Sequence, residues 1–274
     1  MDALELYRWA VQDPETHATV LDVMHRRMNP GRSARVLRED FAGTCAESVS
    51  WVALRPGRSA VAVDLDGRAL AWARRRAAGL LGPMADRVMF IEGDSLAVGI
   101  EAMRADIISV LNFSILYLRD EGMLAQYLAH ARRCLADDGI LVMNVFGGPE
   151  ALRAGSTRHR IEPRPRLSNE QAPPVFDYVW EVKRFVTATS EIECAIHFEV
   201  GEDQDRRDIR NAFEYLWRLW SVETLMNACR TAGFTRVEMW RHTYDPASGV
   251  FLGPVDPGVV RGLDQWTAYI VAGV

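Results

Sequence analysis

An acidic residue and a glycine turn follow one short apolar segment near the N-terminus, and a second acid ends the next such segment. The first segment runs through Glu39 into the turn at residues 41–44, and the second ends at Asp64. A tight turn after a strand lets the backbone approach a ligand, and an acid ending the neighbouring strand accepts hydrogen bonds from both hydroxyls of a ribose. In open α/β sheets both positions lie at the edge where ligands bind. The pattern predicts a site for a ligand that contains a nucleoside.

The elements that must position this site alternate along the first half of the chain. Short apolar runs without polar alternation are typical of strands buried on both faces, and helical stretches with turn residues at their ends separate them. Strands joined by crossover helices predict an α/β fold with a Rossmann-like, doubly wound, mostly parallel sheet. The predicted strands are 35–39, 60–64, 88–92, 106–112 and 140–145, and the predicted helices are 14–28, 46–55, 67–79 and 120–135.

The pattern changes after Gly147-Gly148. Residues 153–174 are rich in Arg and Pro and are predicted to form a loop, whereas 176–186, 191–200 and 209–217 alternate in the manner of antiparallel strands. A helix from Ser221 to Gly233 and strands at 236–241 and 266–271 then complete a seven-stranded core sheet. We expect three parts: a core with its N-terminal helices at 1–148, an inserted antiparallel β cap at 149–220, and a C-terminal part at 221–274.

Composition narrows the function classes. The net charge of -5 gives no broad positive field, which makes nucleic-acid binding a poor expectation. The four cysteines form no close pair, which argues against a zinc site or a disulfide framework, and we expect no metal. No apolar run is long enough to span a membrane, and the acidic N-terminus does not resemble a signal peptide. A reducing cytoplasm is the simplest expected setting.

The first turn resembles the opening motif of the class I S-adenosylmethionine-dependent methyltransferases, which commonly reads V-L-D-L-G-C-G-T-G. Residues 37–45 fill those positions, with Glu39 at the motif acid and Gly43-Thr44 matching its end. Phe41 and Cys45 replace two of the three glycines, and a D-x-F-x-G variant known in the superfamily fits 39–43 closely. The resemblance implies a Rossmann-like methyltransferase that binds S-adenosylmethionine and releases S-adenosylhomocysteine.

The resemblance continues downstream in the order that the family requires. Asp64 matches the ribose-binding acid, Asp94-Ser95 the segment that meets the adenine, and 111–114 the loop that faces the methyl group. Leading segments cover the cofactor in relatives, which implicates the N-terminal aromatic residues. The cofactor-binding residues implied by the resemblance are Tyr7, Trp9, Glu39, Phe41, Gly43, Thr44, Asp64, Leu65, Asp94, Ser95 and Asn112.

The acceptor of the methyl group is expected under the inserted cap, as in similar small-molecule methyltransferases. The candidates are Tyr117, His197, Tyr215 and Arg218, with Arg218 as a clamp for a carboxylate. His197 also fits a structural role on its strand, and Arg218 also fits a pair with an acid. The sequence leaves the acceptor atom open among nitrogen, oxygen and carboxylate, and it leaves a homodimer open.

Three other readings compete with a small-molecule methyltransferase. A dinucleotide needs G-x-G-x-x-G to seat its pyrophosphate, and only Gly43 is present, with Glu47 where the phosphates would lie. An RNA or protein methyltransferase is disfavoured by the acidic pI of about 5.7 and by strand four ending in 112–115 without an N-P-P-Y type motif. The altered glycine turn keeps open a non-catalytic cofactor-binding or scaffolding protein.

Overall fold

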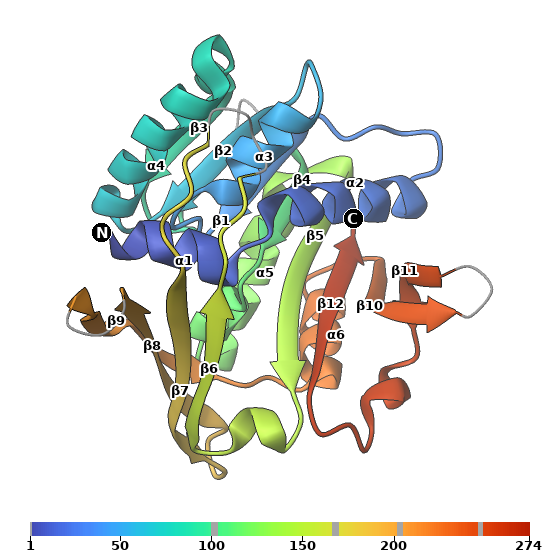
Figure 1. Ribbon diagram of the computed structural model, residues 1–274. Coiled ribbons are helices and arrows are strands. Elements are labelled where there is room, and N and C mark those ends of the chain that lie inside the picture. Colours follow the sequence, from blue (N-terminus) through green and yellow to red (C-terminus); the bar gives the residue numbers. More distant parts are fainter. Residues whose placement is uncertain (1, 100–103, 166–169, 202–204, 246–248) are drawn as a thin grey trace.

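The core is an eight-stranded sheet in the order β11-β10-β12-β5-β4-β1-β2-β3 (Figure 1). The computed structural model describes residues 2–99, 104–165, 170–201, 205–245 and 249–274. Five neighbouring strands pair in parallel, so the predicted doubly wound arrangement is confirmed. These strands are β1 (Val36–Asp40), β2 (Ser59–Asp64), β3 (Val88–Glu92), β4 (Ala105–Val110) and β5 (Leu135–Gly147).

The C-terminal strands add an antiparallel end to this sheet. They are β10 (Arg236–Asp245), β11 (Gly249–Val255) and β12 (Trp266–Gly273), and β12 lies between β5 and β10. The eighth strand, β11, occupies a segment that the sequence predicts to be a loop. Its Gly253 and Pro254 indicate a turn, but an edge strand tolerates a proline because one row of its backbone groups needs no partner in the sheet.

Helices cover both faces of the core sheet. α2, α3 and α4 pack on one face with Leu37, Ile107 and Ile140, whereas α5 and α6 pack on the other with Ile108 and Leu141. Successive residues of a strand point to opposite faces, so uninterrupted apolar strands build both layers. No helix in the described ranges is long and apolar enough to cross a membrane. The helices are α1 (Ala3–Val11), α2 (Pro14–Met28), α3 (Ala46–Leu54), α4 (Gly67–Leu81), α5 (Glu121–Cys134) and α6 (Val222–Thr231), with 3₁₀ turns η1 (Gly82–Arg87), η2 (Ser114–Tyr117), η3 (Glu150–Leu152) and η5 (Pro257–Val260).

The insertion forms a separate antiparallel sheet in the order β6-β7-β8-β9. Its strands are β6 (Gly155–Ile161), β7 (Phe176–Val186), β8 (Glu191–Val200) and β9 (Arg207–Arg218). The bounds of β7 and β8 match the prediction, but β6 lies in the predicted loop. β6 is an exposed edge strand held by backbone pairing with β7, so it carries no apolar pattern that identifies it from sequence. One face of this sheet packs against the core, and α1 lies where the two sheets meet (Figure 1).

Candidate active site

A cavity of about 480 Å³ opens at the carboxyl ends of β1, β2 and β4. Parallel sheets bind ligands at this edge because the loops that follow neighbouring strands converge there. α1 and β9 close the cavity from the other side. We call it the strand-end cavity, and it is lined by Leu4, Tyr7, Phe41, Gly43, Thr44, Asp64, Leu65, Asp66, Ala69, Asp94, Ser95, Leu96, Asn112, Ser114, Tyr117, Leu118, Met123, Phe213, Tyr215 and Trp217.

The turn after β1 forms one wall of this cavity with an unusual backbone. Gly43 has a φ of 50°, and Phe41 and Cys45 also have positive φ, at 56° and 52°. A left-handed conformation costs a residue with a side chain about 1 kcal/mol or more relative to glycine. Phe41 and Cys45 therefore adopt a backbone conformation that favours glycine, and their side chains do not prevent the turn from forming.

Asp64 connects this turn to the end of β2. Its carboxylate accepts the backbone N–H of Gly43 at 2.7 Å and that of Asp66 at 2.8 Å. The side chain is half-buried and borders the strand-end cavity. A carboxylate has about four lone-pair sites, so two remain for hydroxyl donors of a ligand. The arrangement suits a ribose.

A buried ion pair holds the loop after β3 against the cavity. Arg38 and Asp40 are almost fully buried and lie 2.7 Å apart, and Tyr127 donates its hydroxyl to Asp40 at 2.9 Å. The same guanidinium donates to the backbone carbonyls of Ser95 and Val98. The loop that carries Asp94 and Ser95 is thereby fixed to the end of β1.

Glu39 lies beneath the turn, outside the strand-end cavity. Its carboxyl accepts the backbone N–H of Ser48 at 2.8 Å and the hydroxyl of Ser48 at 2.5 Å, so it holds the start of α3. Burial raises the pKa of Glu39 well above its usual value, and the neighbouring Glu47 raises it further. Glu47 in turn lies 2.9 Å from the ring of His17. Glu39 thus supports the turn from behind and does not line the cavity in which the sequence predicts its contact with a cofactor.

Aromatic side chains form the wall opposite the turn. Tyr7 of α1 packs against Phe213 of β9 with ring centroids 4.8 Å apart, and Tyr215 packs against Trp217 at 4.3 Å. Burial raises the pKa of Tyr117 to about 12, and it also raises the pKa values of Tyr7 and Tyr215. These phenols keep their protons at neutral pH, so they act as hydrogen-bond donors and aromatic surfaces rather than as bases.

A second, smaller cavity adjoins the first. It has a volume of about 240 Å³, and it shares Tyr7, Asn112, Tyr215 and Trp217 with the strand-end cavity. None of its lining residues in the described part of the chain is an Asp, Glu, Lys or Arg. We call it the aromatic cavity, and it is lined by Tyr7, Val11, Asn112, Phe113, Phe146, Ala151, Thr157, His159, Tyr178, Trp180, Ile196, Tyr215, Trp217, Gln265 and Thr267.

The structure brings most of the predicted site residues to these two cavities. The predicted residues that line the strand-end cavity are Tyr7, Phe41, Gly43, Thr44, Asp64, Leu65, Asp94, Ser95, Asn112, Tyr117 and Tyr215. Trp9 does not line it, because its indole turns back along α1 and donates to Glu5 at 2.7 Å. Trp9 therefore lies away from the cavity that it is predicted to cover, whereas Tyr7, two residues earlier in α1, lines both cavities.

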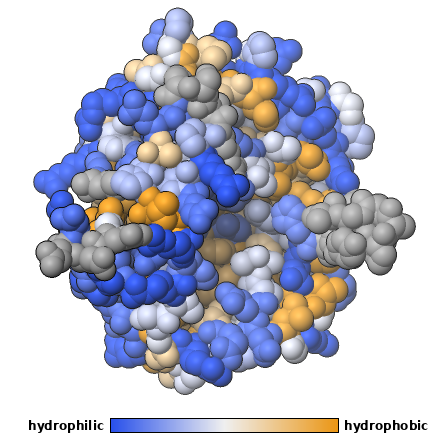
Figure 2. All heavy atoms as spheres, in the orientation of Figure 1, coloured by the Kyte–Doolittle hydropathy of each residue, from blue (hydrophilic) through white to orange (hydrophobic). Residues whose placement is uncertain are grey.

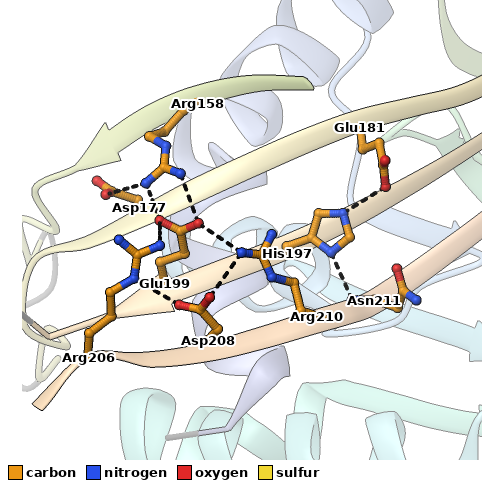
Figure 3. Close-up of polar contacts among 9 residues, drawn as sticks. All are labelled: Arg158, Asp177, Glu181, His197, Glu199, Arg206, Asp208, Arg210 and Asn211. Atoms are coloured by element: carbon orange, nitrogen blue, oxygen red, sulfur yellow. Dashed lines mark hydrogen bonds and ion pairs between the residues drawn. The ribbon is translucent and has the colours of Figure 1, made fainter. Parts of the chain in front are cut away.

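His197 lies on the outer face of the inserted sheet (Figure 3). Its neighbours Ile196 and Phe198 point into the core, and alternation turns His197 the opposite way. The ring lies 3.0 Å from Glu181 and accepts the backbone N–H of Asn211 at 2.8 Å, so its role is structural. Asn211 has a φ of 49° in an irregular part of β9, which the histidine stabilises. His197 thus lines neither cavity, and this geometry agrees with the structural alternative that the sequence also allows.

Arg218 also lies outside both cavities. It donates to the backbone carbonyl of Arg119 at 3.0 Å and stacks on Trp220 at 4.2 Å. The observed contact joins β9 to the loop before α5, away from the cavities in which the sequence predicts a clamp for a carboxylate. The aromatic stripe explains the difference, because Phe213, Tyr215 and Trp217 alternate along β9 and take the inward face.

Several lining residues were missed by sequence reasoning. Phe213 and Trp217 are two residues from Tyr215 on either side, and the strand period of two identifies them. Leu4 lies one helical turn before Tyr7. Asp66 lies two residues after Asp64, and because a helix N-cap already explains an acid at this position, the sequence does not identify it as a lining residue. No group of His, Cys, Asp and Glu side chains in the described residues is arranged to hold a metal ion.

The chain matches no known family model and no curated protein by sequence. Solved structures match it closely in fold. CalS10, an amino pentose methyltransferase from Micromonospora echinaspora, superimposes with a TM-score of 0.66 over 98% of this chain and 94% of its own, at 18% identity. DesVI from Streptomyces venezuelae superimposes with a TM-score of 0.68 over 97% of this chain and 94% of its own, at 17% identity. The sugar N-methyltransferase KedS8 from Streptoalloteichus sp ATCC 53650 superimposes with a TM-score of 0.62 over 91% of this chain and 90% of its own, at 20% identity.

These matches extend over nearly the whole chain, including the inserted sheet. The protein therefore has the Rossmann-like fold of S-adenosylmethionine-dependent methyltransferases, with an added antiparallel subdomain. At such low identity the likeness establishes the fold, while the cofactor and the acceptor must be argued from the two cavities.

Proposed function

We propose that the protein transfers a methyl group from S-adenosylmethionine to an amine nitrogen of a small molecule. The observation that carries the proposal is the meeting of the strand-end cavity and the aromatic cavity at Tyr7, Asn112, Tyr215 and Trp217. A methyl transfer needs two ligands whose reacting atoms lie in line with water excluded. Two adjoining cavities with a shared aromatic wall meet that need.

The cofactor occupies the strand-end cavity in this proposal. Asp64 accepts the ribose hydroxyls, and Asp94 with Ser95 borders the adenine. The turn at Gly43-Thr44 faces the methionine part. The sulfonium then lies beside Tyr7, Tyr215 and Trp217, because aromatic faces attract a cation. Glu39 acts indirectly, since it holds α3 and thus the turn.

Charge favours nitrogen as the acceptor atom. Transfer from a sulfonium to a neutral amine moves a positive charge across the junction, and aromatic faces stabilise that charge at both ends. An ionised oxygen or carboxylate would bring a negative charge into a cavity whose described lining contains no Lys or Arg to pair with it. Two structurally similar proteins are N-methyltransferases: KedS8 acts on a sugar, and MtfA, which superimposes with a TM-score of 0.52, acts on a glycopeptide.

The proposed reaction requires no strong base. Burial disfavours an ammonium ion, so the amine enters the aromatic cavity in its neutral form. Its lone pair forms the bond to the methyl carbon while the carbon–sulfur bond breaks and its electrons stay on sulfur. The methylated nitrogen then gives its surplus proton to water, and S-adenosylhomocysteine leaves. Tyr7 and Tyr215 orient the amine by accepting its N–H groups on their hydroxyl oxygens, which leaves the lone pair free to attack the methyl carbon.

The size of the aromatic cavity disfavours a macromolecular acceptor. A volume of about 240 Å³ between two sheets suits a compact molecule, and the net charge of -5 does not attract RNA. The proposal is tested by calorimetric titration with S-adenosylhomocysteine, followed by methyl transfer from labelled S-adenosylmethionine to a panel of small primary and secondary amines. Absence of cofactor binding would refute it. Binding without transfer to any panel amine or to a cell extract would favour a non-catalytic cofactor-binding protein.

A further inference from the structure

The two cavities reach the protein surface through different elements. The outer end of the strand-end cavity lies beside Leu65, which is 71% exposed, and beside Met123. The outer end of the aromatic cavity lies between β6 and β12, where Thr157, Gln265 and Thr267 are exposed. Its inner end, where it meets the strand-end cavity, is lined by Ile196 and Trp217, which are 2% and 3% exposed. Each cavity therefore has its own opening.

Figure 2 shows a hollow near the centre of the drawn face, between the inserted sheet and β5 with β12, and apolar residues form its floor. The same elements carry the lining of the aromatic cavity, with Phe146 on β5 and Thr267 on β12. Thr157 and His159 of β6 line it from the inserted sheet, and His159 stacks on Tyr178.

The charged residues of β6 point away from this opening. Alternation along the strand turns Arg158 and Arg160 to the outer face, where Arg158 binds Glu199 (Figure 3). Both arginines also contact Asp177. The rim of the opening is therefore polar, and none of its described lining residues is an acid that would retain an ammonium ion. It suits a small neutral amine with hydrogen-bonding groups.

We infer that the acceptor enters the aromatic cavity through this opening between β6 and β12, so that S-adenosylhomocysteine can be exchanged for S-adenosylmethionine while the acceptor stays bound. The identity of the two ligands rests on the proposed function. A primary amine bound there can accept two methyl groups in succession. Each transfer forms one carbon–nitrogen bond, breaks one carbon–sulfur bond and releases one proton to water.

Cysteine accessibility tests the separate opening without knowledge of the acceptor. All four native cysteines are buried, and burial raises the pKa values of Cys194 and Cys229 to about 12, so the native thiols react slowly. Ile196→Cys places a thiol at the inner end of the aromatic cavity, and Ser114→Cys places one in the strand-end cavity. The probe is 2-aminoethyl methanethiosulfonate, a small amine that forms a disulfide with the thiol and releases methanesulfinate.

Saturation with S-adenosylhomocysteine distinguishes the two routes. At about 100 times its Kd, bound ligand should slow labelling of Ser114→Cys roughly 100-fold. Labelling of Ile196→Cys should proceed at an unchanged rate, because the probe arrives through the other opening. Equal protection of both thiols would overturn the inference, since it would mean that the aromatic cavity is reached only through the strand-end cavity.

A blocking substitution gives an independent readout. Thr157→Trp should slow labelling of Ile196→Cys at least about tenfold and leave the calorimetric Kd of S-adenosylhomocysteine unchanged, because a large side chain fills the opening alone. Ser156→Trp, on the opposite face of β6, is the matched control and should leave the labelling rate unchanged. Equal rates with and without Thr157→Trp would also overturn the inference. These rates remain measurable if S-adenosylhomocysteine does not bind, so failure of the proposed function is recognised separately.

Discussion

Replacement of Asp64 by alanine tests the placement of the ribose most directly. The carboxylate accepts two backbone N–H groups, from Gly43 and Asp66, and faces the strand-end cavity. Asp64→Ala removes the proposed partner of the ribose hydroxyls and also frees the turn after β1. We therefore expect it to weaken cofactor binding and to lower stability at the same time.

The magnitude follows from the number and type of hydrogen bonds. Hydrogen bonds to a charged group contribute about 1.5 to 3 kcal/mol, and the lost ribose contacts should lie in that range. Because about 1.4 kcal/mol corresponds to a tenfold change in affinity, the Kd of S-adenosylhomocysteine should rise roughly 10- to 150-fold. The two freed N–H groups lie near water, so the free energy of unfolding should fall by only about 1 kcal/mol.

A matched carboxylate separates the two effects. Asp106 accepts the backbone N–H groups of Arg35 and Val36 at 2.6 and 2.8 Å, at the opposite end of β1 and away from both cavities. Asp106→Ala should lower the free energy of unfolding in urea and leave the calorimetric Kd unchanged. A wild-type Kd in Asp64→Ala, or an equal weakening in Asp106→Ala, would show that Asp64 does not hold the ribose.

Three further predictions concern the supporting contacts. Arg38→Met leaves Asp40 buried without its cation and should lower the free energy of unfolding in urea by about 3 to 5 kcal/mol, whereas a loss below about 1 kcal/mol would contradict a buried pair. Burial raises the pKa of Glu39 in the folded protein, so its contribution to stability is present below its unfolded-state pKa and is lost as the pH rises toward the folded value. The Glu39→Gln side chain cannot ionise, so this variant should lose less stability than wild type as the pH rises from about 5 to about 8. If the free energy of unfolding of both proteins changed with pH in the same way, a protonated Glu39 would be refuted. Arg218→Ala should reduce stability by about 1 kcal/mol through the lost stacking on Trp220 and leave the calorimetric Kd of S-adenosylhomocysteine unchanged, and a weakened Kd would restore a binding role to Arg218.

Local signals in the sequence determine the parallel core and its ligand-binding edge. The apolar runs that became β1 to β5 and the turn at Gly43 are short-range patterns, and Asp64 follows directly from the end of its strand. β7 and β8 are predicted at their observed bounds because their alternation is also local. Each of these features depends on residues within a few positions of one another, so the sequence alone suffices to predict them.

Long-range packing decides the rest of the site. Tyr7 meets Phe213 and Tyr215 only because α1 packs against β9 from the far end of the chain. Which face of β8 turns inward depends on where the inserted sheet docks, and this docking places His197 on the outside. β6 and β11 exist because β7 and β10 offer unpaired backbone groups, which no local pattern reveals. The sequence therefore determines the parallel strands and Asp64 at the end of β2. The two cavities and their separate openings arise only when distant segments are brought together.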